Sequence, residues 1–143
     1  MFRVLTPGFA VAGQLQPEDM AAAAAEGYAL VINNRPDGEE AGQPSAEEIA
    51  EAARAAGLAY RHIPLSGGGL TMDHIGQTEA ALEGAGGPIL AFCRSGMRST
   101  TLWALARAKT GAEPQELVTL AGQAGYDLTP MTGLMEKLKH DNM

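Results

Sequence analysis

Cys93, the one cysteine of this 143-residue chain, lies in a segment whose residue types can perform nucleophilic chemistry. An apolar run over residues 88–92 precedes it and predicts a buried strand, and a helix is expected over residues 99–110. Backbone N–H groups in a loop between a strand and a helix can form an anion site. The segment comprises Cys93, Arg94, Ser95, Gly96, Met97, Arg98 and Ser99. We therefore expect an anion-binding loop that holds Cys93 as a nucleophilic thiolate.

Several features of this segment favour a bound anion and the thiolate over the thiol. Arg98, at the start of the expected helix, can fold back and present a planar fork of donors to an oxyanion. Arg94 is expected to draw anionic substrates to the mouth of the site. Gly96 permits the positive φ that a tight loop needs, and the helix N-terminus adds roughly half a positive charge.

Two other neighbours of Cys93 have roles that the sequence leaves less defined. Met97 is expected to contribute its backbone N–H rather than its thioether, and Ser99 can either hydrogen-bond the sulfur or cap the helix. A structural alternative treats Cys93 as a small buried hydrophobic residue, as free cysteines often are. Two arginines, two serines and a glycine in the next six positions argue against that alternative.

The rest of the chain alternates between short apolar runs and helical patterns. This order predicts right-handed βαβ units around a mainly parallel sheet flanked by helices, which is an α/β fold. Ligands in such folds bind beyond the carboxyl ends of the strands, where the loops 33–44, 65–70 and 93–98 are expected. Strands are predicted at 2–5 and 9–13 (a hairpin or edge pair), 28–32, 58–64 and 88–92, and further helices at 17–26, 45–56, 71–84, 114–124 and 130–139.

The polar loop 33–44 carries two accessory candidates, Arg35 and Asp37. Arg35 has two open interpretations. It either binds an anionic substrate or orders the cysteine loop, or it closes its own loop through an ion pair with Asp37 or Glu39. The glycine-rich segment 66–69 is either a flexible lid or a mobile connection.

Composition limits the class of protein. The length fits one domain, and a net charge of −7 argues against nucleic acid or an anionic membrane as the main partner. The single cysteine excludes an internal disulfide, and no pattern of a signal peptide or membrane span is present, so we expect a soluble cytoplasmic protein. The three histidines lack metal-ligand spacing and no nucleotide-binding motif follows the glycines, so no metal and no cofactor is expected.

Four segments together resemble a known family. They are residues 11–15 (Val-Ala-Gly-Gln-Leu), 31–39, 62–64 (His-Ile-Pro), and 93–99 with Trp103 following. They resemble the bacterial tyrosine-phosphatase-like proteins, the phosphatase-like domain of beta-lactamase-hydrolase-like proteins. The resemblance covers nearly the whole chain. It implies a dual-specificity-phosphatase-like fold with a central, mainly parallel sheet flanked by helices, and residues 1–143 as one domain.

The sequence departs from the tyrosine-phosphatase pattern in two places. Those enzymes use Cys-x5-Arg, whereas Cys93 and Arg98 form Cys-x4-Arg, a spacing that resembles the active loop of rhodaneses. One residue fewer removes one N–H donor and about 3.3–3.6 Å of chain, which favours a sulfur atom over a phosphoryl group. Dual-specificity phosphatases also place a general-acid Asp shortly after an Ile-Pro, and residues 63–68 contain no acid. Asp73 is expected in the first turn of a helix, so Asp37 is the best substitute.

These departures make a sulfurtransferase the first expectation. Cys93 would take sulfur from a small anionic donor, such as thiosulfate or glutathione persulfide, and hold it as a persulfide. An external thiol or cyanide would accept the sulfur. Arg98 and the loop amides would stabilise the bound anion and the persulfide. A sulfur-metabolism protein is a possible partner. The alternative is a cysteine-dependent phosphatase that acts on phosphotyrosine or a small phosphoester through a phosphocysteine, with Asp37 as the acid. A third hypothesis is a non-catalytic module that binds an anion or a partner.

Overall fold

A five-stranded sheet forms the centre of the molecule. The computed structural model describes residues 2–66 and 68–141. Along the sheet the strands stand in the order β1-β2-β5-β3-β4, with β1 antiparallel to β2 and every other pair parallel. The strands are β1 (Arg3–Thr6), β2 (Phe9–Ala12), β3 (Leu30–Asn33), β4 (Ala59–His62) and β5 (Ile89–Phe92). The predicted α/β fold with a mainly parallel sheet is therefore confirmed.

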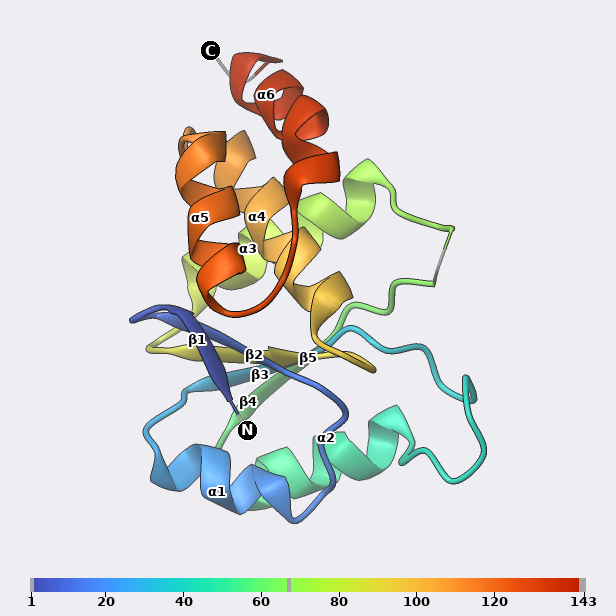
Figure 1. Cartoon of the computed structure of the whole chain (residues 1–143). Coiled ribbons are helices and arrows are strands. Elements are labelled where there is room, and N and C mark those ends of the chain that lie inside the picture. The colour runs from blue at the N-terminus through green and yellow to red at the C-terminus, as the bar shows by residue number, and fades with distance from the viewer. Residues whose placement is uncertain (1, 67, 142–143) are drawn as a thin grey trace.

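Helices cover both faces of this sheet (Figure 1). One face carries α1 and α2, and the other carries α3, α4, α5 and α6 (Figure 1). The helices are α1 (Asp19–Ala25), α2 (Ala46–Ala55), α3 (Met72–Gly84), α4 (Met97–Lys109), α5 (Pro114–Gln123) and α6 (Thr132–Asp141), with a 3-10 turn η1 (Thr129–Met131) before α6. Because both faces are covered, β2, β3 and β5 are buried at every position, and their sequences are continuous apolar runs rather than alternating ones.

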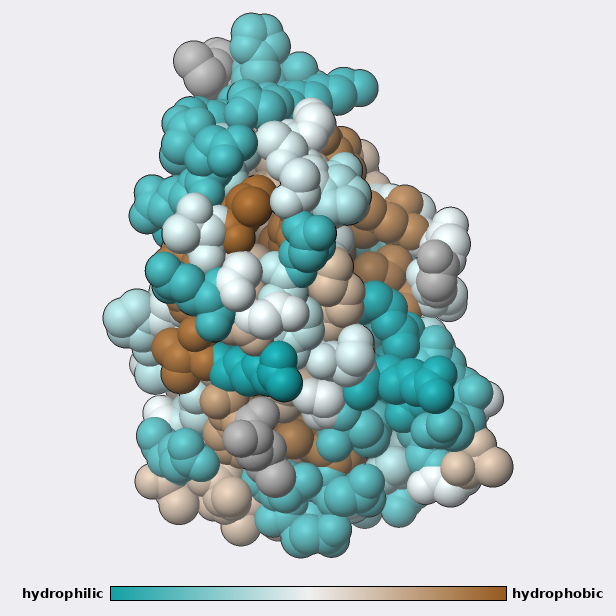
Figure 2. Space-filling view, in the orientation of Figure 1, coloured by the Kyte–Doolittle hydropathy of each residue, from teal (hydrophilic) through white to brown (hydrophobic). Residues whose placement is uncertain are grey.

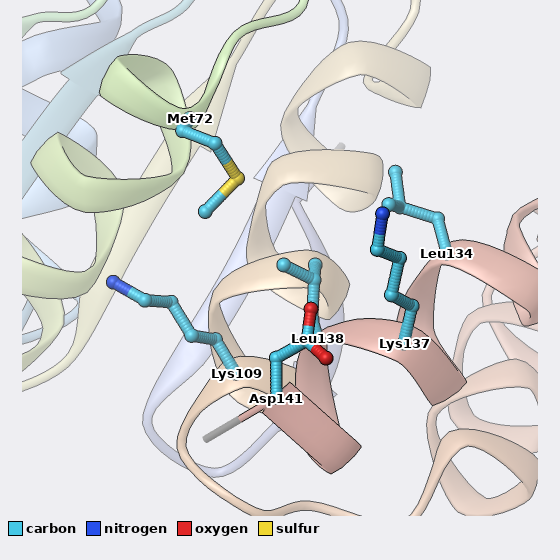
Figure 3. Close-up of a pocket in the computed structure, with 6 residues that line it drawn as sticks. All are labelled: Met72, Lys109, Leu134, Lys137, Leu138 and Asp141. Atoms are coloured by element: carbon cyan, nitrogen blue, oxygen red, sulfur yellow. The ribbon is translucent and has the colours of Figure 1, made fainter.

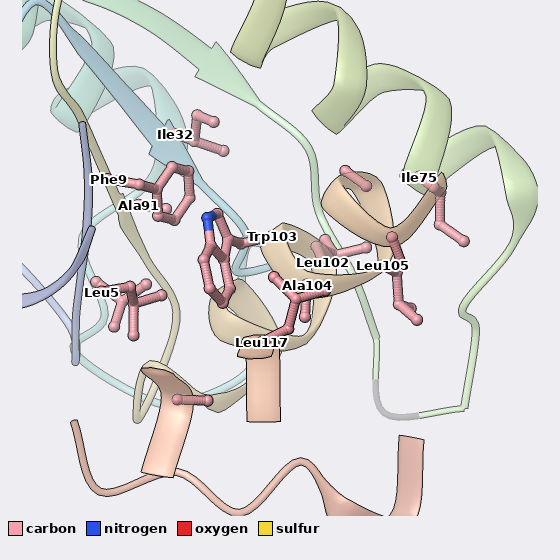
Figure 4. Close-up of a cluster of buried hydrophobic side chains, with 14 of the residues drawn as sticks. Leu5, Phe9, Ile32, Ile75, Ala91, Leu102, Trp103, Ala104, Leu105 and Leu117 are labelled. Carbon is pink, nitrogen blue, oxygen red and sulfur yellow. The ribbon is translucent and has the colours of Figure 1, made fainter. Parts of the chain in front are cut away.

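Helix α4 passes through the larger of two hydrophobic clusters (Figure 4). Its Leu102, Trp103 and Leu105 are at most 1% exposed, and the Trp103 ring stacks on Phe9 with 6.1 Å between ring centroids. The second cluster, which includes Met20, lies between the sheet and the pair α1–α2. A helix that is buried on nearly all sides cannot shift easily, so the core fixes the position of the first turn of α4.

The starts of three helices show which of the predicted helix-start signals the structure confirms. Ser45 and Glu48 form the predicted capping box of α2, and Thr71 caps α3 with the His74 ring as its reciprocal partner. Helix α4 begins at Met97, two residues before the predicted start, because Gly96 adopts a left-handed φ of 95° and turns the chain directly into the helix. Ser99 therefore lies inside α4 and is not its cap.

Within residues 2–66 and 68–141, no helix is both long enough and apolar enough to cross a bilayer.

Candidate active site

Three loops meet at the carboxyl edge of the sheet. The register of the parallel strands places Asn33 at the end of β3 beside Phe92 of β5 and His62 of β4. The loops that follow these strands therefore start side by side, and those after β3 and β5 lie on the same side of the molecule (Figure 1). Hydrophilic side chains cover much of this part of the surface (Figure 2). As predicted, this edge brings the cysteine loop next to the loop 33–44.

Cys93 lies at the base of the cysteine loop and is fully buried. Its backbone N–H donates to the Ala12 carbonyl at 3.4 Å, and its Sγ accepts a hydrogen bond from the Gly96 N–H at 3.1 Å. Hydrogen bonds to an ionised sulfur favour its charged form. The sulfur therefore has a polar hydrogen-bond partner and does not occupy a purely apolar packing position.

The Arg98 guanidinium is bound by the loop after β3 and by the segment after β4. Its Nη1 donates to the Leu65 carbonyl at 2.6 Å and to Glu39 Oε2 at 2.9 Å, while its Nη2 donates to Glu39 Oε1 at 2.9 Å. The hydrogen bonds that Arg98 donates to Glu39 raise the pKa of the guanidinium, and the Cys93 sulfur adds to this effect. Glu39 thus holds one edge of the guanidinium near the Cys93 sulfur.

Arg35 is buried among acceptors from its own loop and from the segment after β2. Its side chain is 2% exposed, and it donates to Glu39 at 2.9 Å, to Gln14 at 2.8 Å and to Glu40 at 3.4 Å. Of the two sequence interpretations, the structure contains the ion pair that closes the loop. Arg35 pairs with Glu39, and among the described residues no ion pair joins it to Asp37. The same Glu39 carboxylate also binds Arg98, so the two arginines share one acceptor.

The remaining loop residues have specific partners. Arg94 is 68% exposed and pairs with Glu40 at 3.4 Å. The Ser95 hydroxyl accepts the Met97 N–H at 3.3 Å, so the Met97 amide is already occupied within the loop. Asp37 accepts the Ala46 N–H at 2.7 Å and so stabilises the start of α2.

Ser99 takes neither of its predicted roles. Its hydroxyl donates to Asn34 Oδ1 at 2.8 Å, while the Asn34 Nδ2 donates to the Ile63 carbonyl at 2.9 Å. His62 hydrogen-bonds the Arg35 carbonyl at 2.9 Å. These buried contacts join the ends of β3 and β4 to α4. Sequence reasoning did not identify Asn34, although the pair Asn33-Asn34 directly after a buried strand was a visible signal.

Several amides at the start of α4 remain available to a ligand. Within the described part of the chain, the N–H groups of Arg94, Ser95, Arg98 and Ser99 donate to no protein acceptor. Helix α4 directs its positive end toward the same loop. Together with the Arg98 guanidinium, these donors can bind the oxygens of a tetrahedral anion against the Cys93 sulfur.

Among the cavities on the side of the sheet covered by α3, α4 and α6, two bear on the search for a site. One, of about 340 Å³, adjoins the site and is lined by Arg98 and by apolar side chains that include Leu65, Met97 and Met131. The other, of about 360 Å³, lies between α3, α4 and α6 (Figure 3). Its Lys109 is twelve residues, or about 18 Å, along α4 from Met97. Only the first cavity contacts a predicted site residue.

Glu39→Gln is expected to change how stability depends on pH. The two arginines lower the pKa of Glu39 to about 2 from 4.5, with the Arg98 hydrogen bond as the largest cause. A lowered folded-state pKa adds stability above pH 4.5, and that stability is lost as the pH falls toward 2. We expect Glu39→Gln to lower the free energy of unfolding by about 1 kcal/mol at pH 7, because the pair is partly exposed.

Urea unfolding from pH 7 to pH 2 measures this effect. The wild type is expected to lose its advantage over Glu39→Gln between pH 4.5 and 2. Glu113→Gln, which removes the exposed partner of Lys139, is the matched control. Parallel pH curves for wild type and Glu39→Gln would contradict the assignment.

Comparisons with known proteins place this site in context. Residues 1–110 match the family model described as Beta-lactamase hydrolase-like protein, phosphatase-like domain. The chain is similar to the Beta-lactamase hydrolase-like protein of Agrobacterium fabrum, with 37% identity over 128 residues. That match covers 89% of this chain and 30% of the relative, so the chain spans about three tenths of the relative's length.

Solved structures show the same architecture. A putative phosphatase from Neisseria meningitidis superposes with a TM-score of 0.82 and 28% identity, covering 94% of this chain and 96% of that one. The active form of Tk-PTP superposes with a TM-score of 0.70 and 15% identity, covering 99% and 97% of the two chains. The second likeness is one of fold alone. The expected dual-specificity-phosphatase-like fold is confirmed.

The sulfurtransferase expectation is wrong. The matching family model and the Neisseria structure are phosphatase-like, and they favour the phosphatase alternative. The error came from counting donors only between Cys93 and Arg98. Among the described residues the amides of Arg98 and Ser99, in the first turn of α4, also lack a protein acceptor, and that count omitted them. The Cys-x4-Arg spacing therefore does not indicate rhodanese chemistry here.

Proposed function

This chain belongs to the family of Beta-lactamase hydrolase-like proteins, phosphatase-like domain, and from that membership we propose that it hydrolyses phosphomonoesters through a phosphocysteine on Cys93. One observation carries the proposal. Cys93 Sγ lies within 3.1 Å of a backbone N–H, beside an arginine and at the N-terminus of a buried helix. These are the groups that stabilise an attacking thiolate and the negative charge of a transferring phosphoryl group.

The proposed reaction has two steps. The Cys93 thiolate attacks phosphorus, a sulfur–phosphorus bond forms, and the bond to the leaving oxygen breaks. Arg98 and the amides of the first turn of α4 bind the phosphoryl oxygens as charge develops on them. Water then attacks the phosphocysteine, breaks the sulfur–phosphorus bond, and releases orthophosphate with the thiolate restored.

Two carboxylates of the loop 33–44 are poorly suited to protonate the leaving oxygen. Glu39 is bound by two arginines and its pKa is lowered to about 2, so it is ionised at neutral pH. Asp37 is hydrogen-bonded at the start of α2. Without a proton from either side chain, a leaving group that is stable as the oxyanion is favoured, and this favours aryl phosphates over alkyl phosphates. The partly apolar cavity beside Arg98 can accept such an organic group.

The experiment that tests the proposal is trapping of the intermediate. Wild-type protein is mixed with p-nitrophenyl phosphate, quenched in acid within the first turnovers, and analysed by peptide mass spectrometry. We expect phosphate on the peptide that contains Cys93 and a burst of p-nitrophenol of about one equivalent. Turnover without a labelled Cys93 peptide, or no turnover at all, would overturn the proposal.

Asp37→Asn tests whether this side chain is the missing acid. We expect kcat for phenyl phosphate to stay within about twofold of wild type, because Asp37 acts as a helix-start acceptor, and stability to fall by about 1 kcal/mol at most. Steady-state kinetics from pH 5 to 8 and thermal unfolding measure the two effects. A general acid contributes roughly 10²–10⁴-fold, so a hundredfold fall in kcat would show that Asp37 donates the proton.

A further inference from the structure

Tyr126 reaches the cysteine loop from a part of the chain that the family model does not cover. It follows α5 and is 7% exposed. Its backbone N–H donates to the Ala121 carbonyl at 2.9 Å, and the Arg3 guanidinium lies 5.4 Å from its ring centroid. The ring is therefore held in place from α5 and from β1.

The Tyr126 hydroxyl binds the peptide unit that faces the sulfur. It donates to the Ser95 carbonyl at 2.9 Å, and the Gly96 N–H of that same peptide donates to Cys93 Sγ at 3.1 Å. In a trans peptide the C=O and the N–H point in opposite directions. A hydroxyl that holds the carbonyl on one side therefore fixes the N–H on the other.

Gly96 fits this contact in two ways. Its φ of 95° is in the left-handed region, and a Cβ at this position would overlap Tyr126 Oη. The hydroxyl thus occupies the space that any other residue at position 96 would need. Burial raises the pKa of Tyr126, Arg3 opposes this, and Cys93 adds to it, so the hydroxyl stays protonated and remains a donor at neutral pH.

We infer that Tyr126 is a positioning residue for Cys93, whose hydroxyl locks the Ser95–Gly96 peptide with its N–H toward the sulfur. The inference rests on the proposed function of this loop, and it adds a determinant of thiolate reactivity outside the loop. Without the hydroxyl, the peptide can rotate and turn a carbonyl oxygen toward the sulfur, which disfavours the thiolate. The charged groups that face this unit are Arg98 from α4, with Glu39 behind it, and Arg3 from β1.

Tyr126→Phe removes the hydroxyl and keeps the ring. Because Cys93 is the one cysteine, alkylation by iodoacetamide reports on it alone. At pH 6 we expect iodoacetamide to alkylate Cys93 about tenfold more slowly in Tyr126→Phe than in wild type. This is the effect expected when the sulfur loses the hydrogen bond from the Gly96 N–H. The rates are expected to converge above pH 10, where the thiol is ionised in both proteins.

Turnover provides a second readout. For p-nitrophenyl phosphate we expect kcat to fall about tenfold while KM stays within threefold, because Arg98 and the first-turn amides still bind the phosphoryl group. Tyr28→Phe is the matched control, since Tyr28 packs against Phe2 in the other hydrophobic cluster. It is expected to match wild type in both assays.

Equal alkylation profiles for Tyr126→Phe and wild type would overturn the inference and leave Tyr126 as a core side chain only. Failure of the proposed function would show differently, as wild-type protein that does not turn over the phosphate, and it would leave the alkylation comparison intact. If Tyr126→Phe does not fold, site-specific replacement of Tyr126 by 4-fluorophenylalanine decides the question. Its fluorine fills nearly the space of the hydroxyl but cannot donate a hydrogen bond to the Ser95 carbonyl, so slow alkylation at pH 6 is again expected.

Discussion

Cys93→Ser is expected to reduce turnover of p-nitrophenyl phosphate to the spontaneous rate, a loss of more than about 10⁴-fold in kcat/KM. Serine is close to cysteine in size and can keep the hydrogen bond from the Gly96 N–H. Its hydroxyl, however, is not ionised at neutral pH and is a far weaker nucleophile in this loop. The proposed first step therefore stops, although the donors that bind the phosphoryl oxygens are unchanged.

Binding measurements on the same variant separate catalysis from simple anion capture. Cys93→Ser is expected to bind orthophosphate with an affinity within about tenfold of wild type in calorimetry, because Arg98 and the amides at the start of α4 remain. Its thermal midpoint is expected to stay close to that of wild type. Equal turnover by wild type and Cys93→Ser would contradict a reaction through a phosphocysteine on Cys93. Phosphate binding by both proteins without turnover by either would favour the non-catalytic binding module.

Arg98→Lys is expected to lower kcat/KM for the same substrate by about 10²–10³-fold. The Arg98 guanidinium donates at once to both oxygens of Glu39 and to the Leu65 carbonyl, and it lies near the sulfur. Lysine keeps the charge but has a single nitrogen without a planar fork. It cannot satisfy Glu39 and bind two phosphoryl oxygens in a fixed geometry.

The control for Arg98→Lys lies on the same helix. Arg107 is exposed, nine residues further along α4, and Arg107→Lys is expected to leave kcat/KM within twofold of wild type. Both variants keep the net charge of the chain, so a difference between them reflects geometry rather than the overall field. Equal activity of Arg98→Lys and wild type would show that Arg98 contributes only its charge.

Local sequence signals determined the elements and the cysteine loop. Continuous apolar runs identified β3 and β5, because strands covered on both faces need apolar residues at every position. The pair Ser45 and Glu48 identified the start of α2, because a capping box lies within four residues. The sequence also predicted that Cys93 follows a strand and that a helix begins shortly after Gly96, which places the sulfur at the helix N-terminus. Each of these signals depends on only a few neighbouring residues.

The partners of the catalytic candidates were decided by the tertiary structure alone. Arg98 binds Glu39, 59 residues earlier, and Ser99 binds Asn34, 65 residues earlier. Tyr126 contacts Ser95 from 31 residues later, and Arg35 is buried although arginine is usually exposed. Such contacts depend on the register of β3 beside β5 and on the packing of α4, which no local pattern encodes.

The same distinction explains the error about the reaction. The spacing between Cys93 and Arg98 is a local count, and it suggested a loop with too few donors for a phosphoryl group. The available donors also include the amides of Arg98 and Ser99 in the first turn of α4, which begins at Met97 after the left-handed turn at Gly96. Sequence thus determined which residues form the anion-binding loop, whereas the folded chain determined how many donors that loop offers.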